Sequence, residues 1–349
     1  MQGKDYEIMP LSVAQLEEQL QQHQLAPVYL IQGQDHYLLK QVRQAFLSLI
    51  DPADRTLNFA QYDMREAPLA TALDDARNVP FFGTYRLVMI DDAYFLTGET
   101  QHSKPNHDLS QLLEYLSHPE PQTLLVLFAP YEKLDSRKKV TKQLKERAVY
   151  VPFGKLTERD LRQFVQARLD KQGYNMSMEA QTALLNLTNF SLTQIMAELT
   201  KLMLYAEQSH TIDLQTVRDL VTKTLSQNVF DLIDQLLKQH LRQAVELYHE
   251  LLINGEEPLR IQAAILSQFR LLVQVKASTL SEQGLAKALK VHPYRIKLAK
   301  QTVRRYRYAT LGRAYLGLIR LEEQLKSTQR DPELLFELFI LRYQATVRE

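Results

Sequence analysis

The residues with the clearest potential for chemistry follow an apolar run at residues 27–33, which reads Pro-Val-Tyr-Leu-Ile-Gln-Gly. A nucleotide-binding P-loop places G-x-x-x-x-G-K-[ST] after such a strand and at the start of a helix. Gly33 and Lys40 match part of this pattern, but there is no second glycine, and neither Ser nor Thr follows Lys40. Asp35 would also repel a phosphate. The sequence therefore predicts a degenerate, non-functional nucleotide site.

A second fragment of nucleotide chemistry is Asp91-Asp92, which ends the apolar run at residues 87–90. In a Walker B strand such acids hold Mg²⁺ and polarise water. The alternative is that they are solvated acids at a strand end. We favour this alternative because there is no phosphate cradle, and because only 10 of 349 residues are glycine. The nine histidines show no metal-ligand spacing, so we predict no metal site.

An adjacent aromatic pair, Phe81-Phe82, lies between Pro80 and Gly83. A loop bounded in this way cannot easily direct both rings into one core. Exposed aromatic rings on a stiff loop are typical binding hot spots, because a large ring is buried at modest entropy cost. The alternative is that both rings cap the local core. We favour a protein-binding loop.

Two basic segments are less specific. The first contains Arg137, Lys138, Lys139 and Lys142, which could contact DNA phosphates or form a solvated helix face. The second is residues 287–307, where eight Lys and Arg residues are interleaved with Tyr294 and Tyr306 and followed by Tyr308. Such a mixture can bind single strands. For the second segment we favour a solvated or subunit-contacting face.

The elements that must position these residues change character along the chain. Five short apolar runs in residues 1–152 alternate with segments of helical spacing, which predicts a parallel sheet covered on both faces. Such sheets bind ligands at the carboxyl ends of their strands. The rest of the chain shows helical periodicity. The predicted fold is therefore an α/β domain (1–152), a small all-α domain (153–225) and a larger all-α domain (226–349).

Composition limits the class of protein. The first domain has a net charge of −5 and the last +6, which suggests different partners at the two ends. The absence of cysteine excludes a disulfide scaffold and thiolate zinc sites, and fits a reducing cytoplasm. No stretch of 18 apolar residues or apolar leader is present, so we expect a cytoplasmic protein with no membrane partner.

With this order of domains, seven groups of residues become recognisable over almost the whole chain. Because of these seven groups taken together, the chain resembles the delta-subunit family of bacterial DNA polymerase III, of the type found in Gram-positive bacteria. The matching groups are PVYLIQG at 27–33, VPFFG at 79–83, FAP at 128–130 with KLD at 133–135 and RKK at 137–139, NVFDL at 228–232, GEEP at 255–258, QFRLL at 268–272 and VHPYR at 291–295.

This resemblance implies the clamp-loader subunit that opens the sliding clamp, the beta subunit of DNA polymerase III. It implies an AAA+-like, P-loop-like domain without a working nucleotide site, then a helical lid and a helical collar. The implied partners are the gamma/tau and delta prime subunits, and primed DNA within the complex. No cofactor and no intrinsic catalysis are implied, since polymerase (nucleotidyltransferase) activity belongs to the holoenzyme.

The resemblance also implies a role for the loop that contains the aromatic pair. Val79, Pro80, Phe81 and Phe82 match the family's hydrophobic clamp-binding wedge. Arg77 stands roughly where related clamp-binding motifs carry glutamine.

Two other functions are compatible with single features of the chain. An active AAA+ ATPase would bind ATP as an isolated chain, which the residues after Gly33 argue against. A helical DNA-binding protein that acts alone would bind DNA without partners and with strong salt dependence. The clamp-loader interpretation instead predicts tight clamp binding, no ATP turnover, and DNA contact within the assembled loader.

Overall fold

The computed structural model describes residues 10–81, 83–99 and 105–348, and it divides the chain into two compact units, Met1–Phe164 and Val165–Glu349. The first unit contains a five-stranded parallel sheet in the order β2-β3-β4-β1-β5. Its strands are β1 (Val28–Gln32), β2 (Phe59–Asp63), β3 (Arg86–Asp91), β4 (Thr123–Ala129) and β5 (Val149–Pro152). The predicted parallel sheet is confirmed, and each strand lies within a residue or two of its apolar run.

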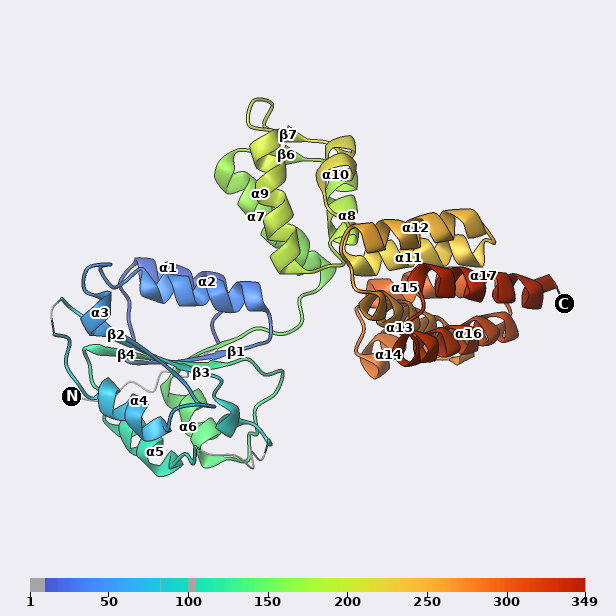
Figure 1. The fold of residues 1–349 in the computed structure, drawn as a ribbon. Helices are drawn as coiled ribbons and strands as arrows, with labels where there is room; N and C mark the ends of the chain where they lie inside the picture. Colours follow the sequence, from blue (N-terminus) through green and yellow to red (C-terminus); the bar gives the residue numbers. More distant parts are fainter. Residues whose placement is uncertain (1–9, 82, 100–104, 349) are drawn as a thin grey trace. The chain divides into compact units, whose positions relative to one another are not determined.

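Helices cover both faces of this sheet (Figure 1). One face packs against α1 (Val13–Gln21) and α2 (His36–Leu47), and the other against α4 (Leu69–Ala76), α5 (Leu109–Ser117) and α6 (Lys139–Arg147). Successive residues of β1 alternate between the two cores, because side chains on a strand point to opposite faces. The short helices α3 (Arg55–Asn58) and η1 (Tyr94–Leu96) lie between strands.

The second unit is mainly helical. Its first part contains α7 (Glu158–Gln172), which begins in the first unit, then α8 (Met178–Leu187), α9 (Leu192–Tyr205) and α10 (Leu214–Leu220). The expectation of an all-α segment here is wrong in one detail, since β6 (Asn175–Met176) and β7 (Thr211–Ile212) form a parallel pair. Two residues per strand are too few to produce a recognisable period.

The last part of the second unit has a hydrophobic core of its own. It is built from residues 229–343, which include the stacked rings of Tyr248 and Phe336 at a centroid distance of 4.1 Å. The helices are α11 (Leu225–Leu237), α12 (Leu241–Ile253), α13 (Pro258–Ala277), α14 (Glu282–Leu289), α15 (Pro293–Val303), α16 (Tyr308–Ser327) and α17 (Pro332–Arg348). No helix among the described residues is long and apolar enough to cross a membrane.

Candidate functional site

Residues 77–83, which we call the aromatic loop, connect the end of α4 to the start of β3 at the amino edge of the sheet. Phe81 is 71% exposed and Val79 is 59% exposed, while Pro80 is half-buried. Phe82 lies outside the described residues. The Phe81 ring is therefore not a core residue, and the loop presents two large apolar side chains to solvent.

Buried side chains fix the backbone of this exposed loop. The hydroxyl of Tyr115 donates to the carbonyl of Ala76 at 3.3 Å, and that of Thr123 donates to the carbonyl of Asn78, also at 3.3 Å. The side-chain oxygen of Asn58 accepts from the amide of Phe81 at 2.7 Å. Tyr115, Thr123 and Asn58 are all buried. The loop thus has a defined backbone beneath apolar side chains that are exposed.

An ion pair joins the two elements that the loop connects. Arg86, the first residue of β3, pairs with Asp75 of α4, and both side chains are only 14% exposed. A second nitrogen of Arg86 donates to the carbonyl of Leu57 at 2.8 Å. Arg77, where related motifs have glutamine, pairs instead with Asp74 at 3.2 Å and Glu114 at 3.9 Å. Its guanidinium has carboxylate partners beside the loop.

The predicted degenerate nucleotide site lies at the opposite, carboxyl edge of the sheet. Gly33 follows β1, and the ring of Phe153 lies directly against its backbone. A Cβ atom at Gly33 would lie 2.2 Å from a ring carbon of Phe153 and 2.4 Å from that residue's carbonyl oxygen. A protein side chain therefore fills the space next to the turn.

This close approach predicts a stability effect. Gly33→Ala should lower the free energy of unfolding by about 1–3 kcal/mol, because the added methyl group forces Phe153 or the backbone to move. Urea unfolding would measure the change. Gly154→Ala is the matched control, since no heavy atom lies within 4 Å of its added Cβ. Equal stability of the two variants would contradict the packing described here.

The amino terminus of α2 is capped by a side chain of the protein itself. The carboxylate of Asp35 accepts from the amides of Tyr37 at 3.0 Å and Leu38 at 3.1 Å. These are the groups that P-loop proteins direct at phosphates. Lys40 lies one turn further along and is exposed. The chain's own carboxylate thus takes the position of a bound anion.

The two acids that end β3 are paired with arginines. Asp91 forms an ion pair with Arg43 of α2 and accepts a hydrogen bond from Gln61 of β2. The Arg43 guanidinium also lies 4.5 Å from the ring centroid of Phe128. Since Arg43 already neutralises Asp91, this acid is poorly placed to act as a metal ligand.

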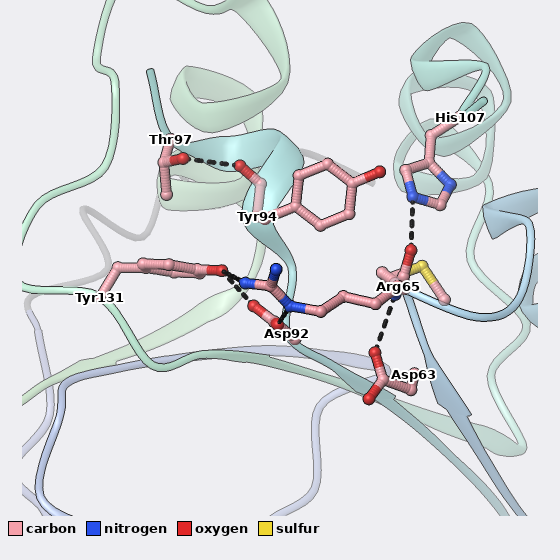
Figure 2. A network of polar contacts seen from close by, with 8 residues as sticks. Asp63, Arg65, Asp92, Tyr94, Thr97, His107 and Tyr131 are labelled. Carbon is pink, nitrogen blue, oxygen red and sulfur yellow. Dashed lines mark hydrogen bonds and ion pairs between the residues drawn. The ribbon is translucent and has the colours of Figure 1, made fainter. Parts of the chain in front are cut away.

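Asp92 is engaged in the same way, as Figure 2 shows. It forms an ion pair with Arg65 and accepts a hydrogen bond from the hydroxyl of Tyr131. Burial, together with this hydrogen bond, raises the pKa of Tyr131, so the phenol stays protonated. Among the described residues, no cluster of three or more His, Asp or Glu side chains could hold a metal ion.

The first basic segment leads into α6 at the same carboxyl edge of the sheet. Arg137 pairs with Asp135, whose pKa this contact lowers to about 2, and Lys138 donates to the carbonyl of Phe95 at 2.9 Å. Lys139 and Lys142 are exposed on α6, and neither side chain forms an ion pair or hydrogen bond within the described part of the chain. Half of the predicted DNA contacts thus have partners within the protein.

The sequence did not indicate which residues contact the aromatic loop, or which residues pair with the acids at the end of β3. Asn58 and Thr123 bond to the aromatic loop across 23 and 45 positions, and Arg65 reaches Asp92 across 27. No local pattern marks such contacts. The available signal was Asn58 directly before the apolar residues of β2, and an asparagine at such a place predicts a turn but no contact with the aromatic loop.

Comparisons with known proteins find the same kind of relative over nearly the whole chain. Family profiles for the DNA polymerase III delta subunit and for its C-terminal domain match residues 29–154 and 226–343. DNA polymerase III subunit delta of Bacillus subtilis is 35% identical over 329 residues, covering 93% of this chain and 94% of the relative. A probable delta subunit from Aquifex aeolicus is 26% identical over 47% of this chain and 48% of its own length.

The fold agrees with a solved structure as well. The Bacillus subtilis DNA clamp loader delta protein superposes with a TM-score of 0.75 and 34% identity, over 95% of this chain and 99% of that one. The degenerate turn after β1, the aromatic loop and these similarities lead to one conclusion. The chain belongs to the family of DNA polymerase III delta subunits, which are components of the clamp loader.

Proposed function

We propose that this chain binds the sliding clamp, the beta subunit of DNA polymerase III, through the aromatic loop. By opening the clamp, it allows the ring to be loaded on primed DNA. The observation that carries this proposal is the 71% exposure of Phe81 on a loop whose backbone is hydrogen-bonded to buried side chains. A large exposed ring on a loop with an ordered backbone can serve as the hot spot of an interface.

The capture of the purified clamp by the isolated full-length chain tests this proposal. Biolayer interferometry should detect a saturable complex without ATP, DNA or other subunits. Tyr205→Ala provides a matched control, because Tyr205 is an equally exposed ring (69%) on α9 in the other unit. The control should bind the clamp as the unaltered chain does. Failure of the unaltered chain to bind would refute the proposal.

We also propose that residues 1–152, 153–225 and 226–349 act as an AAA+-like domain, a lid and a collar. The separate hydrophobic core of residues 229–343 supports an independent C-terminal domain. In this proposal the collar joins the chain to the gamma/tau and delta prime subunits. The small α7–α10 segment lies between the other two domains in sequence.

The chain should act without catalysis of its own. We expect no measurable ATP binding, because Asp35 caps α2, Phe153 covers Gly33, and Arg43 and Arg65 neutralise the acids at the end of β3. Isothermal titration calorimetry at protein concentrations of tens of micromolar would measure this. A micromolar dissociation constant for Mg-ATP would contradict it and would favour the active ATPase.

Lys139 and Lys142 are the basic residues that best fit contact with DNA phosphates. They are three positions apart on α6, so they lie on the same side of the helix. Arg137 and Lys138 are engaged with Asp135 and a backbone carbonyl, which leaves them less available. We therefore assign DNA contact within the assembled loader to the exposed side of α6. The other basic segment, residues 287–307, remains a candidate subunit-contacting face.

A further inference from the structure

A buried side chain bonds to the aromatic loop at its exposed phenylalanine, Phe81. Tyr115 bonds to Ala76, directly before the loop, and Thr123 bonds to Asn78 within it; the Arg86–Asp75 ion pair lies where the chain returns to the sheet. Asn58 bonds to the amide of Phe81 itself, at 2.7 Å. Its side chain is only 1% exposed, although the Phe81 ring above it is 71% exposed.

Asn58 also lies near Gly83. Gly83 has φ +78°, a conformation that favours glycine, and a Cβ added there would lie 4.0 Å from the amide nitrogen of Asn58. Asn58 ends α3 immediately before β2, so its position is set by the sheet. Near Gly83 the closer neighbour of such a Cβ is the Asp54 carboxylate, at 3.4 Å, so the bond to Phe81 is the direct contact of Asn58 with the loop.

A loop that is ordered before binding loses less conformational entropy when it binds. Pro80 restricts the backbone before Phe81, and the Asn58 hydrogen bond fixes the orientation of the next peptide unit. We propose that Asn58 is a positioning residue of the aromatic loop: it pre-orders Phe81 for its partner without touching that partner. This inference rests on the proposed clamp binding.

The first test replaces the amide group with an apolar group of similar size. Asn58→Leu should weaken clamp binding by about 5- to 30-fold, the equivalent of one buried hydrogen bond. Asn58→Asp keeps an acceptor oxygen at the same place and should restore most of the affinity. If Leu and Asp at this position have the same effect, the acceptor oxygen has no positioning role.

The second test asks whether Asn58 acts through Phe81. In a double-mutant cycle, Asn58→Leu should have little further effect on clamp affinity once Phe81→Ala is present, because no ring is left to position. Independent, additive losses would overturn the inference. The Phe81→Ala variant alone reports on the proposed function, so the failure of one proposal is distinguishable from the failure of the other.

A matched control separates positioning from general stability. Gln262 is a fully buried amide in the other unit, and it donates to the carbonyl of Leu318 at 2.7 Å. Gln262→Leu removes a comparable side chain–backbone hydrogen bond. It should lower stability as Asn58→Leu does, but leave clamp affinity within about two-fold. An equal loss of clamp affinity in both variants would contradict a local role for Asn58.

A final measurement needs neither the clamp nor a variant. The amide of Phe81 should exchange with deuterium at least about tenfold more slowly than an unstructured amide, despite its exposed side chain. Nuclear magnetic resonance at single-residue resolution would follow it. Exchange at the unstructured rate would show that the Asn58 bond does not order the loop, and would overturn the inference.

Discussion

Replacing both Phe81 and Phe82 with alanine is expected to lower the affinity of the chain for the sliding clamp by about 30- to 1,000-fold. Truncating a hot-spot aromatic typically costs about 2–4 kcal/mol, which corresponds to this range. Clamp loading should be lost as well. A closed clamp opens only if something binds the opened form preferentially, and an apolar wedge near a subunit interface can supply that preference. Surface plasmon resonance and a loading assay would measure the two effects.

The same variant should remain folded. Phe81 is exposed, so its truncation removes little buried area, and thermal unfolding and assembly with partner subunits should be nearly normal. A large fall in melting temperature would show that one of the rings contributes to the core. Unchanged clamp affinity in a folded variant would instead place the clamp-binding surface elsewhere on the α/β domain.

Deleting residues 226–349 is expected to abolish assembly with the gamma/tau and delta prime subunits, while clamp binding by the remaining chain persists. The reason is that α11–α17 enclose a core of their own, and the aromatic loop belongs to the other unit. Gel filtration of the mixed subunits would show whether the truncated chain co-elutes with them.

The reciprocal fragment is the control for this deletion. Residues 226–349 expressed alone should fold cooperatively and co-elute with the partner subunits, but should not bind the clamp. Normal assembly of residues 1–225 would refute the collar assignment. Clamp binding by the C-terminal fragment would refute the assignment of the clamp site to the aromatic loop.

The central strands of the sheet were predictable because they are buried. A strand covered on both faces is mostly apolar, as in β4, where all seven residues are buried and only Thr123 is polar. The helices that were not predicted include α1, α3 and α8. Helix α1 carries a Ser12–Gln15 capping box and buried Val13, Leu16 and Leu20, a usable signal that was not recognised. Helix α8 buries Ala180 and Gln181 as well as leucines, so its apolar stripe is weak.

The candidate site was predictable only in part. Pro80 and Gly83 mark a stiff loop locally, and they indicated an exposed aromatic at Phe81. The partners of Asp91 and Asp92 could not be inferred, because Arg43 and Arg65 approach from α2 and from the segment after β2 only once the sheet has formed. Contacts of this kind depend on strand order, which apolar runs do not encode.

The carboxylate of Asp35 at the start of α2 bears on how such a subunit is regulated. Two ligands influence each other only through a coupling free energy, and the coupling is reciprocal. We propose that this chain, in which Asp35 caps α2, binds no nucleotide, and the coupling is then zero. Its intrinsic affinity for the clamp should then be identical in ATP, in ADP and without nucleotide. Any nucleotide dependence of loading would then come from neighbouring subunits of the loader.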